Sequence, residues 1–112
     1  MLTLYGIKNC DTVKKARRWL EEHEVEYQFH DFRQDGLDKK LLSSWVESLG
    51  WEKVVNKRST TWRNLSDKEK EISTNAQAVK LLAINPTLIK RPVVQDNKNL
   101  LLGFKEAEYN KL

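Results

Sequence analysis

The sequence is poor in the residues from which many small active sites are built. It contains one cysteine, so no internal disulfide can form, and a reducing compartment suits the chain. Together with this cysteine, His23 and His30 lack the number and spacing of ligands that a structural zinc site needs, so we expect no metal. The four glycines are isolated from one another, which excludes a glycine-rich nucleotide-binding loop.

Long apolar runs and blocks of one charge are also missing. No run of 18 apolar residues and no signal-peptide pattern occur, so we expect a cytoplasmic location and no membrane association. The net charge is +4, yet no lysine and arginine run is interleaved with aromatic residues, so we expect small anionic ligands and no direct nucleic-acid binding. With 112 residues, the chain suits a single domain over residues 1–112 and a monomer.

Apolar periodicity predicts a mixed α/β chain. The apolar run over residues 1–6 predicts a strand, and apolar residues at helical spacing predict a helix over residues 11–23. Alternation over residues 25–31 predicts a second, half-buried strand. A right-handed strand–helix–strand unit with parallel strands is therefore expected at the start.

The segment over residues 38–85 is predicted to be a helical insertion. Asp38 is a suitable N-cap for a helix that ends at Gly50. Residues 51–61 have no clean period and predict a loop that leads into a short helical turn.

Two further helix starts are predicted in the second half of this insertion. Ser66-Asp-Lys-Glu69 matches a capping box, and Asn75 can cap the next helix. Pro86 ends that helix because proline lacks the N–H donor that a continuing helix needs.

A hairpin and a terminal helix close the chain. Residues 88–94 and 100–102 are predicted strands on either side of Asp96–Asn99, whose residue types favour a turn, and a helix is expected after Gly103. This order of elements is thioredoxin-like: βαβ, helical insertion, β-hairpin and terminal helix. In that fold the first strand–helix junction carries the active thiol, and a cis-proline before the third strand lies close to it, for which Pro92 is the candidate.

Cys10 lies at the predicted first strand–helix junction. A helix N-terminus favours a thiolate through unpaired backbone N–H groups and the helix dipole, which makes Cys10 a candidate reactive thiol. The alternative is that Cys10 is a small core hydrophobe. A phosphatase loop is excluded, because the sixth residue after the cysteine is Ala16 and not arginine.

Three motifs together resemble the ArsC family: Tyr5-Gly-Ile-Lys-Asn-Cys-Asp-Thr12, Asn56-Lys-Arg-Ser59 and Leu88-Ile-Lys-Arg-Pro-Val-Val94. The resemblance covers essentially the whole chain and is strongest to the short YffB-type branch. That branch is related to glutaredoxin-coupled arsenate reductases and to the Spx regulators that bind RNA polymerase. The resemblance implies a single nucleophilic cysteine that works with arginines holding an oxyanion or a thiol cofactor.

Departures from the family pattern discriminate between its activities. Arg91 matches the arginine beside the cis-proline, but Asn56 stands where a second arginine is expected, and the third falls near Phe104 or Lys105. Arsenate reduction is therefore the less favoured alternative, since asparagine offers no charge to an oxyanion and lysine only a point charge. Val13 replaces the second cysteine of the Cys-x-x-Cys redox switch of Spx.

The resemblance and the single cysteine together favour a glutathione-dependent monothiol reductase. In this interpretation Cys10 is the nucleophile, forms a mixed disulfide, and is assisted by Arg91; an external thiol resolves the intermediate. Glutathione is the expected co-substrate, with glutaredoxin or RNA polymerase as candidate protein partners. Substrate contacts are expected from five residues: Lys8, Asn9, Thr12, Arg58 and Pro92. The alternative is a non-catalytic, Spx-like regulatory module that binds RNA polymerase.

Overall fold

The computed structural model describes residues 2–112, and the chain divides into two compact units. Residues 2–36 and 91–112 form the first unit, and Leu37–Lys90 form the second. The predicted helical insertion over residues 38–85 lies within the second unit.

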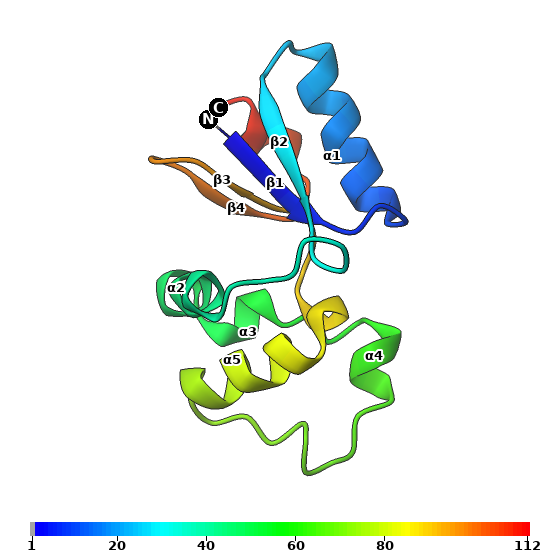
Figure 1. The fold of residues 1–112 in the computed structure, drawn as a ribbon, viewed down its shortest axis with the longest axis vertical. Helices are drawn as coiled ribbons and strands as arrows, with labels where there is room; N and C mark the ends of the chain where they lie inside the picture. Colours follow the sequence, from blue (N-terminus) through cyan, green and yellow to red (C-terminus); the bar gives the residue numbers. More distant parts are fainter. Residues whose placement is uncertain (1) are drawn as a thin grey trace. The chain divides into compact units, whose positions relative to one another are not determined.

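The first unit contains a four-stranded sheet, β1 (Leu2–Gly6), β2 (Tyr27–Asp31), β3 (Val93–Gln95) and β4 (Leu100–Leu102). The strand order is β2-β1-β3-β4, with β1 parallel to β2 and the other two pairs antiparallel (Figure 1). This confirms the predicted βαβ start and the closing hairpin. Met1, part of the predicted first strand, lies outside the described residues.

Two helices pack on one face of this sheet, α1 (Asp11–Glu22) and α6 (Glu106–Tyr109). The rings of Trp19 and Tyr109 meet edge to face at 5.4 Å, joining the two helices. Burial raises the pKa of the Tyr109 phenol, whose hydroxyl donates to the Gly103 carbonyl at 3.0 Å. The core cluster of this unit consists of Leu2, Leu4, Val13, Ala16, Trp19, Leu20, Val94 and Tyr109.

The second unit is helical. Its elements are α2 (Lys39–Leu49), α3 (Trp51–Val54), α4 (Thr60–Arg63), α5 (Asn75–Ile84) and the 3-10 helix η1 (Pro86–Leu88). As predicted, Asp38 caps α2 by accepting the Lys40 N–H at 2.9 Å, and Gly50 ends the helix at φ 87°. The fully buried side chains here include Leu42, Trp45, Val54 and Leu82, so this unit has a hydrophobic core of its own.

The predicted loop over residues 51–61 is wrong in its first part. Residues 51–54 form α3, and Ser59 caps α4 by accepting the Trp62 N–H at 3.1 Å. A helix of four residues is too short to show an apolar period, so its sequence pattern carries no helical signal.

The capping-box segment and the start of α5 also differ from expectation. Ser66 and Glu69 make the reciprocal bonds of a capping box, at 2.9 and 3.2 Å, yet the segment forms a turn and not a helix. The N-cap of α5 is Thr74, not Asn75: Thr74 has extended geometry, and its hydroxyl accepts the Gln77 N–H at 3.2 Å. Asn75 is already helical, so it cannot supply the cap.

The strand predicted over residues 88–94 begins later than expected. Leu88 belongs to η1, Ile89 forms an isolated bridge with Val55, and β3 starts at Val93. The proline before Val93 has no N–H to give to a sheet, so the ladder starts after it. The hairpin turn is confirmed, since the Asp96 N–H donates to the Asn99 carbonyl at 3.0 Å.

Candidate functional site

Cys10 is the N-cap residue of α1. Its backbone is extended, with φ −114° and ψ 123°, and its carbonyl oxygen accepts the Lys14 N–H at 3.0 Å. The side chain makes no capping hydrogen bond, so the sulfur does not serve as the helix cap. A thiolate here would meet the free N–H groups of the first turn and the positive end of the helix dipole.

The Cys10 side chain is half-buried and packs against the core cluster of the first unit. Its placement depends on a close approach of β1 and α1. A Cβ on Gly6 would lie 2.7 Å from Cγ2 of Val13, so only glycine allows this spacing. Cys10 is therefore held by packing while remaining partly open to solvent.

The Arg91–Pro92 peptide bond is cis, at the position that the sequence singles out. Pro92 is buried, and its carbonyl accepts the Gly103 N–H at 2.8 Å. In the antiparallel β1–β3 pair Tyr5 is opposite Val93, so continuing the register brings Pro92 to the end of β1. The cis-proline and the loop that leads to Cys10 thus share one edge of the sheet.

Arg91 accompanies this proline. The residue is half-buried, and its Nε atom is buried. Because the adjacent Pro92 lies at the end of β1, the guanidinium-bearing residue belongs to the same sheet edge as the loop before Cys10.

Asp31 holds that loop from the end of β2. The residue is 3% exposed, and its carboxylate accepts the N–H groups of Arg33 at 2.7 Å, of Gln34 at 3.2 Å, and of Lys8. Burial raises the pKa of this carboxyl, but these three donors and the Lys8 charge lower it by more, so the net pKa lies below its ordinary value. An ionised, buried carboxylate therefore ties the loop before Cys10 to the loop after β2.

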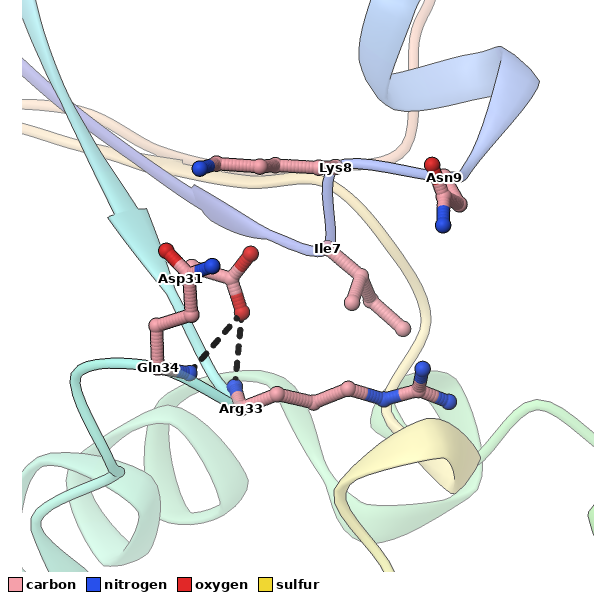
Figure 2. Close-up of a pocket in the computed structure, with 6 residues that line it drawn as sticks. All are labelled: Ile7, Lys8, Asn9, Asp31, Arg33 and Gln34. Carbon is pink, nitrogen blue, oxygen red and sulfur yellow. Dashed lines mark hydrogen bonds between the residues drawn. The ribbon is translucent and has the colours of Figure 1, made fainter.

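A small open cavity lies between these two loops. It has a volume of about 220 Å³ and is lined by Ile7, Lys8, Asn9, Asp31, Arg33 and Gln34 (Figure 2). Figure 2 shows Lys8 extending over Asp31 and Gln34, while Arg33 extends past Ile7.

The sequence singled out two of the cavity residues, Lys8 and Asn9, and missed the rest. The signal that could have found Arg33 is topological. Parallel pairing of Gly6 with Asp31 places the residues after both strands at the same edge of the sheet.

The two remaining predicted contact residues lie in different units. Thr12 is exposed on the first turn of α1, in the first unit. Arg58 is exposed in the second unit, where its N–H donates to Oδ1 of Asn56 at 3.1 Å. Its predicted contact with a substrate stays a prediction.

Two negative findings concern residues 2–112. No group of three or more His, Cys, Asp or Glu side chains among them could hold a metal ion. Within the same range, no helix is both long and apolar enough to cross a membrane.

Comparisons with known proteins agree with this geometry. The model of the ArsC family matches residues 5–112. An uncharacterized protein of Haemophilus influenzae is 52% identical over 109 residues, which are 97% of this chain and 96% of the relative. The global transcriptional regulator Spx of Streptococcus agalactiae is 34% identical, over 96% of this chain and 80% of the regulator. The solved structure of the YffB protein has a TM-score of 0.95 at 43% identity, covering 99% of this chain and 97% of YffB.

Proposed function

The chain belongs to the ArsC family, and we propose that it is a glutathione-dependent monothiol reductase whose nucleophile is Cys10. One observation carries the proposal: Cys10 caps α1 without using its sulfur as the cap, at the sheet edge that also bears Arg91. A cysteine retained only for packing would need neither feature.

The proposed reaction has two thiol–disulfide exchange steps. The Cys10 thiolate attacks the glutathione sulfur of a mixed disulfide R–S–S–G, the S–S bond breaks, and R–S⁻ leaves and takes up a proton. A second glutathione thiolate then attacks the glutathione sulfur bound to Cys10. This releases glutathione disulfide and regenerates the Cys10 thiolate, so one glutathione thiol is oxidised to the disulfide level and the R sulfur is reduced to a thiol. The second thiol must come from outside, because the chain has no other cysteine.

The neighbouring residues have distinct roles in this scheme. Arg91 supplies a positive charge that favours the thiolate and attracts an anionic substrate. Pro92 bounds the site at the end of β1 and has no N–H to compete for the substrate. Lys8, Asn9 and Thr12 flank the sulfur along the chain and offer an ammonium, an amide and a hydroxyl, and Arg58 stays a predicted substrate contact.

The test is the pH dependence of Cys10 alkylation, with and without glutathione disulfide, followed by mass spectrometry. We expect alkylation well below the pH at which an ordinary cysteine of pKa about 8.5 reacts, and a glutathione adduct on Cys10. Cys10→Ser should lose the adduct and all thiol turnover while folding normally. Ordinary thiol reactivity without an adduct would overturn the proposal and leave Cys10 as a packing residue.

A second candidate function rests on the Spx relatives. The global transcriptional regulator Spx is similar over 96% of this chain, so the second candidate is a regulatory module. The partner that we propose for such a module is RNA polymerase. In that case Cys10→Ser would leave partner binding intact. Purified RNA polymerase would then retain the wild-type protein and the Cys10→Ser variant equally in a pull-down. The reductase is favoured because a regulator that switches by an internal disulfide needs a second cysteine, and Val13 stands at that place.

Arsenate reduction is less favoured as a third candidate. At the place of one expected arginine stands Asn56, whose side-chain oxygen accepts the Arg58 N–H within its own loop. A side chain engaged in this way offers an oxyanion neither charge nor a bidentate fork.

A further inference from the structure

The cavity between the loop before Cys10 and the loop after β2 has a distinctive lining. Of its six residues, Lys8 and Arg33 are cationic and exposed, and Asn9 and Gln34 bring exposed amide side chains. All of these groups can donate hydrogen bonds, which is the donor set that a carboxylate needs.

The one acidic residue of the cavity opposes anion binding only weakly. Asp31 is 3% exposed, and its carboxylate already accepts the backbone N–H groups of Lys8, Arg33 and Gln34. Those three donors and the charge of Lys8 offset its charge from within the protein. The side chains that face solvent in the cavity are therefore the two cations and the two amides.

The cavity also has a suitable size and place. A volume of about 220 Å³ equals that of roughly seven water molecules at about 30 Å³ each, enough for one amino-acid residue with its carboxylate. The Cα atoms of Lys8 and Cys10 are two peptide steps apart, so at most about 7.6 Å separates them. Two extended residues, from the cysteine of glutathione to either end, span about 7 Å, which allows one molecule to present its sulfur to Cys10 and its end to the cavity.

We propose that this cavity binds a terminal carboxylate of the disulfide substrate, and that Arg33 and Lys8 select for that charge. The inference rests on the proposed function, which it deepens by naming the substrate class: disulfides that carry a carboxylate on the residue next to the one that bears the sulfur. The role of Arg33 is the new part of this proposal, because no local sequence pattern predicts that Arg33 contacts the substrate.

The test compares two disulfides in single-turnover formation of the Cys10 mixed disulfide. Glutathione disulfide carries carboxylates, and bis(2-hydroxyethyl) disulfide carries no charge. In both cases the Cys10 thiolate forms a new S–S bond, the substrate S–S bond breaks, and one substrate thiolate leaves. The measured quantity is the ratio of the two rate constants, charged substrate over neutral substrate.

We expect Arg33→Gln and Lys8→Gln each to lower this ratio about five-fold, and Arg33→Lys to retain most of it. Arg18→Gln is the matched control, since Arg18 is exposed on α1 outside the cavity and carries the same charge. The ratio of the wild-type protein should also fall with added salt, and that of Arg33→Gln should fall less.

Three results would count against the proposal in different ways. A ratio that is unchanged in Arg33→Gln and in Lys8→Gln overturns the carboxylate site. An equal fall of the ratio in Arg18→Gln also overturns it, because it would show a general effect of net charge. If the wild-type protein reacts with neither disulfide, the proposed function itself fails, whereas reaction with a ratio that is insensitive to Arg33 and Lys8 refutes only the cavity.

Discussion

A buried carboxylate connects the two loops at the Cys10 edge of the sheet. Asp31 is the buried charged side chain among residues 2–112, and its acceptors are filled by N–H groups from both loops. A buried charge is tolerated when its hydrogen-bonding capacity is met in this way. The loop before Cys10 is thus hydrogen-bonded to an ionised side chain that lies outside it.

Replacing Asp31 by Asn should destabilise the protein by about 1.5–3 kcal/mol at pH 7, since hydrogen bonds to a charged group are lost. The pKa of Asp31 is lower in the folded protein than its ordinary value of about 3.9, so its contribution is present above that pH and disappears as pH falls through the folded pKa. The stability difference between wild type and Asp31→Asn should therefore shrink below about pH 4. Urea unfolding at pH 7 and pH 3 measures it.

The control for this experiment is Asp67→Asn, an exposed carboxyl in a turn of the second unit. It removes the same charge and should change stability by less than about 0.5 kcal/mol at either pH. A difference for Asp31→Asn that stays constant from pH 7 to pH 3 would contradict the role of its charge.

Single residues also differ in how well their sequence context reveals them. Cys10 and Pro92 stand at places that element order and the family motifs single out, and the structure has the junction and the cis bond there. No local motif or apolar period points to Asp31 or Arg33. Their importance comes from the parallel pairing of β1 with β2, which brings distant loops together.

At the scale of elements, the contact between β1 and α1 sets the geometry of the junction. Gly6→Ala would place a Cβ 2.7 Å from Cγ2 of Val13, so we expect a loss of about 1–3 kcal/mol in the free energy of unfolding. In the double variant with Val13→Ala the clash disappears, so the two effects should be non-additive by about 0.5–3 kcal/mol. Denaturation of the four proteins of this cycle measures the coupling, and simple additivity would refute the steric explanation.

The start of α5 offers a comparison of neighbouring residues. Thr74→Ala should cost about 1 kcal/mol because the Gln77 N–H loses its cap, while Asn75→Ala, inside the helix, should be neutral or slightly stabilising. Thermal denaturation of the two variants distinguishes them. A larger loss of stability for Asn75→Ala than for Thr74→Ala would show that Asn75 is the N-cap, as the sequence pattern predicts.

Helix and strand limits could be predicted where a local signal is strong. Asp38 and Gly50 bound α2 as expected, because a cap and a left-handed glycine act within a few residues. The four-residue α3 could not be predicted, since its formation depends on burial of Val54. The late start of β3 has a local cause, because Pro92 lacks the N–H that a sheet ladder needs.

The whole molecule consists of two units, each with a core of its own. Leu82→Ala, in α5, and Leu20→Ala, in α1, remove fully buried side chains of equal size, and each should cost about 2–5 kcal/mol. We expect Leu82→Ala to raise amide hydrogen exchange mainly in residues 37–90, and Leu20→Ala mainly in residues 2–36 and 91–112. Uniform acceleration over the chain by both variants would show one cooperative domain, as the chain length alone predicts.

The sequence by itself determined the order of elements, the thioredoxin-like class and the place of the single thiol, because apolar period, caps and turn residues act over short stretches of chain. Tertiary structure alone decided which side chains line the cavity beside the loop that leads to that thiol. Arg33 and Asp31 lie beside the loop before Cys10 only because β2 pairs in parallel with β1, and the Asp31 carboxylate then joins the two loops by accepting the Lys8 N–H. Such contacts join residues far apart in the chain, so no local pattern contains them.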